Sequence, residues 1–249
     1  MKNKVLSINH LKKSYHDKKS EIKALDDINF DVYEKEFISI VGPSGCGKST
    51  ILSILSMLEE KSGVTFSLDK DATIGYMLQE DSLFFWRTIL DNCLIGLEIT
   101  NKLNEENKNY VLNLLKTYGL YEFKDKYPSS LSGGMRQRVA LIRTLAIKPD
   151  ILLLDEPMSA LDYQSRLAIS DDIYKIIKNE GKTAIMVTHD IAEAISMSDR
   201  VIVLTKRPAK VKKIYEIKLS NKSTPINNRK CKEFSTYYDT IWRDLDVHI

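Results

Sequence analysis

Residues 42–50 form a glycine-rich segment that directly follows a short apolar stretch and could bind phosphate. The segment matches the pattern GxxxxGK[ST] with Gly42, Pro43, Ser44, Gly45, Cys46, Gly47, Lys48, Ser49 and Thr50. Glycines let successive backbone N–H groups curl closely around a phosphate, which side chains would obstruct. Lys48 is then placed to reach the β- and γ-phosphates and Ser49 to give a hydroxyl to Mg²⁺. A plain structural turn is the alternative, and the strand-then-helix setting disfavours it.

Two carboxylates and a histidine follow other apolar stretches in the same way. Asp155 and Glu156 come after residues 151–154, and His189 comes shortly after residues 184–187. Because open α/β sheets carry their sites at the carboxyl ends of strands, we expect these side chains beside the glycine-rich segment. Asp155 suits Mg²⁺ held through water, Glu156 suits a general base for the attacking water, and His189 suits contact with the γ-phosphate. Alone, each would more often be a strand end, a core residue or a cap.

A second glycine pair opens a different helical pattern. It lies in the run Leu131-Ser132-Gly133-Gly134-Met135-Arg136-Gln137. Ser132 is typical of a helix N-cap, and the two glycines have no side chains to cover the backbone N–H groups at the start of the helix. The apolar face of that helix is predicted to contain Met135, Val139, Ile142 and Ala146. The run therefore predicts a second anion-binding helix terminus, with a flexible capped turn as the alternative.

These residues must be positioned by an α/β core, which the alternation of apolar stretches and helical patterns predicts. Strands that are apolar on both faces belong in a parallel sheet covered by helices. The stretches of this kind are residues 37–41, 151–154, 184–187 and 201–204. The helical patterns between them are residues 48–58, 134–147, 163–178 and 190–197.

Two regions depart from this alternation. Residues 4–33 and 64–77 are expected to form short antiparallel strands. Residues from about 80 to 148 contain mostly helix-like sequence where the core needs another strand, so we expect a helical insertion there.

The composition is that of an ordinary soluble globular protein. The chain has 249 residues, 43% of them hydrophobic, and 37 basic against 34 acidic residues give a net charge of +3. This balance gives no support to a chain held on a partner by bulk electrostatics. No apolar stretch approaches the ~20 residues that a membrane helix needs, and residues 1–10 lack a secretory pattern. Three scattered cysteines, Cys46, Cys93 and Cys231, favour a reducing cytosol.

The positive charge gathers late in the chain. Residues 206–232 contain ten Lys or Arg and one acidic residue, Glu216, which leaves 27 basic against 33 acidic residues elsewhere. A solvated basic edge followed by a terminal helix is the simpler interpretation. Binding to anionic lipid headgroups or to an acidic partner is the alternative.

With these motifs in hand, the chain resembles the nucleotide-binding subunits of ABC transporters from about residue 5 to residue 219. The motifs follow the family's order: the phosphate loop, Gln79, the signature residues 131–135, Asp155-Glu156, residues 159–162 and His189. The resemblance implies a P-loop NTPase (RecA-like) core with an antiparallel β subdomain and an inserted α-helical signature subdomain. The ATP-binding domain would then span residues 1–220, with a basic, helical tail over residues 221–249.

The resemblance also implies how ATP is held. Two subunits would pair head to tail, so that ATP lies between the phosphate loop of one and Ser132, Gly133, Gly134 and Met135 of the other. Tyr15 matches the aromatic residue that stacks on adenine, although a surface tyrosine is the alternative. Gln79 matches the glutamine that touches Mg²⁺ or water and links the site to the membrane subunit. Asp162 matches the aspartate of the D-loop.

Within the family, residues 79–92 resemble a stretch of the nitrate, sulfonate and taurine importer branch, in which Met135 also recurs in the signature. Phe85 stands where that branch has proline, and residues 63–79 are shorter by about a dozen residues. The neighbouring aromatic segment Phe84-Phe85-Trp86 is expected to meet a helix of the membrane subunit, with a place in the core as the alternative.

We therefore expect an ATP- and Mg²⁺-dependent ATPase at the cytoplasmic face of the membrane that powers import of a small solute. It would form a homodimer or pair with a paralogue, join separate permease subunits, depend indirectly on a solute-binding protein, and bind no nucleic acid. A soluble ABC-type ATPase acting on DNA or ribosomes is the alternative, but it would usually carry a coiled-coil insertion or a second phosphate loop. A non-hydrolysing regulatory subunit is disfavoured by the intact Lys48, Glu156 and His189.

Overall fold

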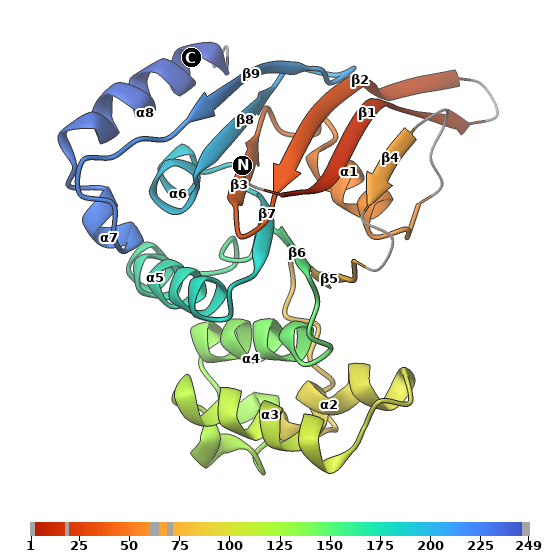
Figure 1. The fold of residues 1–249 in the computed structure, drawn as a ribbon, viewed down its shortest axis with the longest axis vertical. Coiled ribbons are helices and arrows are strands. Elements are labelled where there is room, and N and C mark those ends of the chain that lie inside the picture. The colour runs from red at the N-terminus through yellow and green to blue at the C-terminus, as the bar shows by residue number, and fades with distance from the viewer. Residues whose placement is uncertain (1–2, 18–19, 60–64, 69–71, 246–249) are drawn as a thin grey trace.

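The computed structural model describes residues 3–17, 20–59, 65–68 and 72–245, and Figure 1 shows the fold that they form. The strands are β1 (Lys4–Asp17), β2 (Ser20–Tyr33), β3 (Phe37–Val41), β4 (Thr65–Leu68), β5 (Ile74–Met77), β6 (Ile151–Asp155), β7 (Thr183–Val187), β8 (Arg200–Leu204) and β9 (Val211–Glu216). The helices are α1 (Lys48–Leu55), α2 (Ile89–Ile99), α3 (Glu105–Thr117), α4 (Gly133–Leu145), α5 (Tyr163–Asn179), α6 (Ile191–Met197), α7 (Pro225–Asn228) and α8 (Lys232–Asp244).

A six-stranded sheet forms the centre, in the order β5-β6-β7-β3-β8-β9. Five of its strands run parallel, and β9 pairs antiparallel to β8. The central strands β3, β6 and β7 are buried along their whole length, as their apolar stretches predict. The α/β core expected from the sequence is thereby confirmed.

Alternate side chains of the central strands enter two different cores. In β6, Ile151 and Leu153 pack with α1 and with the smaller sheet, whereas Leu152 and Leu154 pack with the helices α4 and α5. Successive side chains of a strand point to opposite faces, so an apolar run such as residues 151–154 fits only a sheet that is covered on both sides. A third core lies between β8, β9 and the helices α6 and α8.

The smaller sheet has the order β2-β1-β4 and is antiparallel throughout. Antiparallel strands over residues 4–33 are therefore confirmed, but β1 and β2 are long, at 14 residues each. The prediction for residues 64–77 is wrong in part, and Val64 lies outside the described residues. β4 pairs antiparallel with β1, whereas β5 pairs parallel with β6 and forms the edge of the large sheet.

The helices α2, α3 and α4 come between β5 and β6 in the chain and lie together at the bottom of the view in Figure 1. Two tyrosines join this group to the end of α5. The hydroxyls of Tyr110 and Tyr118 donate to the carboxylate of Glu180 at 2.9 and 3.2 Å. Burial raises the pKa of both tyrosines, that of Tyr118 to about 12, so both keep their protons for this contact at neutral pH.

The last part of the chain packs onto the core. The Asn228 side chain is fully buried and donates to the Ser196 carbonyl at 2.7 Å. Some of the basic residues of this part are paired with acidic residues: Lys210 lies 3.0 Å from Asp26 and Lys222 lies 2.6 Å from Asp199. The charge segregation in the sequence is therefore partly neutralised in the folded chain. None of the helices in the described residues is long and apolar enough to cross a membrane.

Candidate nucleotide site

The glycine-rich segment connects β3 to α1 through a loop in which two glycines have positive φ angles. Gly45 and Gly47 have φ angles of 69° and 116°, a backbone region that favours glycine. At Gly47 a Cβ would also come within 2.8 Å of the Leu25 side chain. The buried ammonium of Lys48 donates to the carbonyls of Gly42 and Pro43 at 3.0 and 3.2 Å, so its charge lies inside the loop.

Ser49, in the first turn of α1, meets Asp155 at the carboxyl end of β6. The Ser49 hydroxyl donates to Asp155 Oδ1 at 3.0 Å, and the Tyr76 hydroxyl donates to Asp155 Oδ2 at 3.0 Å. Burial raises the pKa of the Asp155 carboxyl, while these two hydrogen bonds oppose the rise. A hydroxyl and a carboxylate side by side are oxygen donors of the kind that Mg²⁺ takes together with phosphate oxygens, so the residues fit that ion.

Glu156 and His189 contact each other at the same edge of the sheet. His189 Nδ1 lies 2.9 Å from Glu156 Oε2. Because a carboxylate only accepts hydrogen bonds, an ionised Glu156 requires the proton of the imidazole on Nδ1. Glu156 has a φ of 44°, which is uncommon for a residue other than glycine. Such strain is found at functional sites, where the surrounding structure holds it in place.

A buried network holds the segment that carries His189. The Thr188 hydroxyl donates to Glu193 Oε2 at 2.7 Å, and Glu193 is almost fully buried. Arg166 of α5 lies 3.6 Å from Glu193 and 3.7 Å from Asp190. Burial raises the pKa of Glu193 above its ordinary value. Sequence reasoning missed this network, because Arg166 reaches Glu193 and Asp190 from a different helix.

The signature residues start α4, as predicted. Ser132 caps the helix by accepting a hydrogen bond from the Met135 N–H. A Cβ at Gly134 would lie 2.7 Å from Ile169 Cδ1, and one at Gly133 would lie 3.0 Å from Leu161 Cδ2. The two glycines therefore also let α4 approach α5 and the residue Leu161 before it, a packing reason in addition to the anion-binding reason inferred from the sequence. In Figure 1, α4 lies well apart from α1, so the signature is remote from the phosphate loop of its own chain.

The resemblance alone suggested three further site residues, Tyr15, Gln79 and Asp162, and each makes a hydrogen-bonding contact in the structure. The Tyr15 hydroxyl lies 3.3 Å from the Thr50 hydroxyl and donates to Glu59 at 2.7 Å, so the ring lies beside the phosphate loop. The Gln79 amide lies 3.4 Å from the Ser159 hydroxyl. Asp162 caps α5 by accepting from a backbone N–H, and this hydrogen bond lowers the pKa of its carboxyl.

Sequence reasoning missed the residues that tie the Gln79 segment to the signature helix. Arg136 donates to the Asp81 carboxylate at 2.9 Å, one residue after the Gly-Gly-Met run. Arg143 donates to the carbonyls of Asp81 and Ser82, at 2.7 Å each. The carboxylate and carbonyls that these arginines reach lie more than 50 positions earlier in the chain and could not be inferred without the fold.

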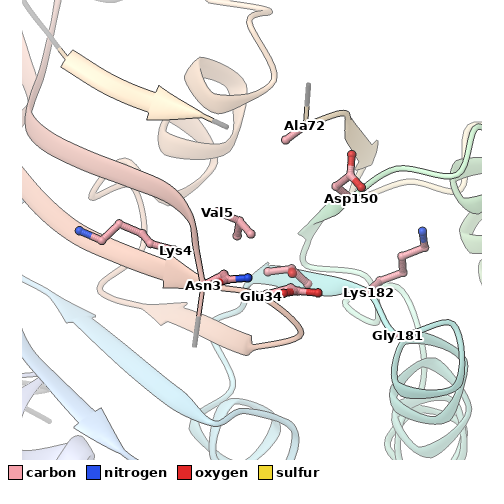
Figure 2. A pocket seen from close by; sticks show the side chains of 9 residues that line it. Asn3, Lys4, Val5, Glu34, Ala72, Asp150, Gly181 and Lys182 are labelled. Atoms are coloured by element: carbon pink, nitrogen blue, oxygen red, sulfur yellow. The ribbon is translucent and has the colours of Figure 1, made fainter. Parts of the chain in front are cut away.

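A cavity of about 540 Å³ lies elsewhere, at the beginning of β6 and β7 (Figure 2). Its charged side chains include Lys4, Glu34, Asp150 and Lys182. Asp150 comes just before β6, so the cavity is at the amino ends of strands whose carboxyl ends carry Asp155 and Glu156. It is therefore separate from the candidate nucleotide site.

Comparisons with known proteins agree with this geometry. A family model described as ABC transporter matches residues 25–159. The uncharacterized ABC transporter ATP-binding protein YtlC of Bacillus subtilis (strain 168) is 44% identical over 97% of this chain and 95% of its own length. The taurine import ATP-binding protein TauB of Roseobacter denitrificans is 35% identical over 92% of this chain and 88% of its own length.

Solved structures show the same fold. A dimeric structure of MJ0796, a bacterial ABC transporter cassette, is 32% identical, with a TM-score of 0.72 over 86% of this chain and 99% of that one. A dimeric post-hydrolysis state of the same cassette, bound to ADP and Pi, has a TM-score of 0.71. The family match, the two relatives and the phosphate loop with its neighbouring carboxylates lead to one conclusion: the chain belongs to the ABC transporter family and is an ATPase of that family.

Proposed function

We propose that ATP and Mg²⁺ bind at the edge formed by residues 42–50, Asp155, Glu156 and His189. Lys48 lies inside the loop of residues 42–50, where it would meet the β- and γ-phosphates. Ser49 and Asp155, with Gln79 from the neighbouring segment, would hold the ion, which screens phosphate charge when bound. Glu156 would take a proton from the attacking water, and His189, already hydrogen-bonded to it, would contact the γ-phosphate.

Replacing Lys48 with Ala tests the assignment of the loop. The ammonium is the buried cation that contacts the loop carbonyls, so its loss should weaken nucleotide binding strongly. Equilibrium titration with a fluorescent ATP analogue measures the dissociation constant directly. An affinity equal to that of the wild type would contradict the assignment.

The second half of each nucleotide site would come from another copy of the chain or from a paralogue. The signature at Ser132–Gly134 lies away from the loop of its own chain, so it cannot complete that site without a partner subunit. A two-fold axis that brings each loop to the partner's signature completes two sites at once. The dimeric structures of the MJ0796 cassette support this arrangement.

We further propose that the ATPase lies at the cytoplasmic face of the membrane and powers import of a small solute through separate permease subunits. The solute would be nitrate-, sulfonate- or taurine-like, or another small nutrient. A solute-binding protein would deliver the cargo. The observation that supports docking is the aromatic segment after Gln79. The side chains of Phe85 and Trp86 are 73% and 61% exposed and stack edge to face on each other. Exposed aromatic clusters of this kind mark protein contacts.

Substitution of Trp86 by Ala tests this docking. The variant should keep its basal ATPase activity but lose co-purification with co-expressed permease subunits, and lose transport in proteoliposomes. Ile99→Ala is a matched control, because Ile99 is 75% exposed at the far end of α2. Undisturbed co-purification and transport in Trp86→Ala would refute the docking proposal. Ligand screening of the associated solute-binding protein then identifies the solute class.

A further inference from the structure

Arg207 reaches the phosphate loop from a distant part of the chain. It lies in the connection between β8 and β9, and its guanidinium donates to the Gly45 carbonyl from Nε at 3.1 Å and from Nη2 at 2.6 Å. Two donors on one carbonyl oxygen fix its direction more closely than one, and hydrogen bonds from a charged donor are stronger than neutral ones.

The connection that carries Arg207 is itself anchored. Ala209 is fully buried and exchanges backbone hydrogen bonds with β2, from its N–H to the Ala24 carbonyl and from the Asp26 N–H to its own carbonyl, both at 2.9 Å. Thr205 and Lys210 close the turn through a backbone hydrogen bond of 3.0 Å. Arg207 therefore extends from a turn whose backbone is held in place, and this turn keeps the exposed Arg207 side chain within reach of the Gly45 carbonyl.

The direction of the Gly45 carbonyl determines the direction of the next donor. In a trans peptide the carbonyl and the following N–H point opposite ways. With the Gly45 oxygen turned toward Arg207, the Cys46 N–H points into the loop, where it donates to the Pro43 carbonyl at 3.2 Å. Lys48 Nζ donates to the same oxygen. A phosphate that enters the loop would compete for these two donors.

We propose that Arg207 is a positioning residue for nucleotide binding: it holds the Gly45–Cys46 peptide so that the Cys46 N–H faces the phosphates. The guanidinium sits on the outer side of the loop and acts through the backbone. Its loss should therefore weaken the binding of ATP and ADP alike while leaving the rate at saturating ATP nearly unchanged. The inference depends on the phosphate-binding role proposed above for residues 42–50.

The test compares Arg207→Met, Arg207→Lys and the neighbouring control Lys206→Met in the full chain. Dissociation constants for ATP and ADP, KM, kcat and the melting temperature are measured for each. We expect the Met variant at Arg207 to bind both nucleotides about tenfold more weakly, the size of one charged hydrogen bond. The Lys variant keeps the charge without the fork of two donors, so it should recover only part of this loss. Lys206→Met should match the wild type.

Each other outcome overturns the proposal. Unchanged affinity in Arg207→Met removes any role for the residue, and full recovery in Arg207→Lys shows that charge alone suffices. An equal loss in Lys206→Met would point to bulk charge, and a fall in kcat at unchanged affinity would place the effect on the chemical step. If Arg207→Met has a lower melting temperature than the wild type, the affinity of Arg207→Lys tests the proposal instead: a partial loss supports it and wild-type affinity overturns it. Wild-type affinity in Lys48→Ala, by contrast, would refute the loop assignment itself.

Discussion

The sign of the stability change caused by Gly134→Ala should depend on residue 169. The Cβ of an alanine at position 134 would lie 2.7 and 2.9 Å from Cδ1 and Cγ1 of Ile169, about 1 Å inside normal carbon contact. Overpacking of this kind costs about 1–3 kcal/mol. Alanine in a helix is otherwise favoured over glycine by up to about 1 kcal/mol. With Ile169 present, we expect a net destabilisation of about 1–2 kcal/mol.

In an Ile169→Ala background the obstructing atoms are gone. The same Gly134→Ala change should then stabilise the chain by about 0.5 kcal/mol, which gives a coupling energy of roughly 1.5–2.5 kcal/mol. Urea unfolding of the four proteins, followed by circular dichroism, measures this cycle. The cost of Ile169→Ala itself, about 2–5 kcal/mol, is common to both arms and cancels.

The ATPase rates of the same four proteins distinguish the packing role of Gly134 from its proposed role in nucleotide binding. If the bare backbone at Gly134 serves a nucleotide across the dimer, activity should stay low in the double variant although its packing conflict is relieved. Equal destabilisation by Gly134→Ala in both backgrounds would refute the packing argument. Recovery of the ATPase rate in the double variant would refute the need for a bare backbone.

Three further results are expected. Glu156→Gln should bind ATP normally but turn over at least about a hundredfold more slowly, and a wild-type rate would remove Glu156 as the base. Tyr76→Phe should lower the free energy of unfolding without nucleotide by about 1.5–3 kcal/mol through the lost hydrogen bond to Asp155, and unchanged urea denaturation would contradict this. Burial alone would raise the pKa of Asp199, but the hydrogen bonds from Lys222 and from the Phe37 N–H outweigh it and lower the pKa. The ionised carboxylate therefore stabilises the fold at every pH above the pKa of an ordinary carboxyl group. The stability gap between wild type and Asp199→Asn should therefore stay constant from pH 8 to about 5 and narrow only below about 4; narrowing above pH 5 would be inconsistent with a lowered pKa.

The sequence predicted the central sheet well because its strands are apolar on both faces. Residues 151–154 and 184–187 fit only a covered parallel sheet, and the polar residues that follow them lie at its carboxyl edge. Residues 74–77 were misassigned because an edge strand is half exposed, so its pattern shows a strand without showing its partner. Pairing direction depends on contacts that lie far apart in the sequence.

In the candidate site too, residues placed by local sequence could be predicted, and residues placed by distant contacts could not. Lys48, Asp155, Glu156 and His189 each lie at the end of a strand or within a few residues after one, so local sequence was enough to bring them to one edge. Arg207 contacts a carbonyl 162 positions away, and the partner of a backbone carbonyl has no signature in the sequence. Residues that act through the main chain of another segment are therefore the ones that sequence reasoning misses.

The packing of residues 222–228 also has a consequence for biosynthesis. Asp199 needs Lys222, Ser196 needs Asn228, and the Asp171 carboxylate accepts from the Ile226 N–H at 2.8 Å. While these partners are still inside the ribosome, the emerging chain carries a partly buried acidic group and an inward-facing carbonyl that lack them. The nascent ATPase fold therefore reaches its full stability only after residues 222–228 have left the ribosome, well after the last strand of the parallel sheet has been made.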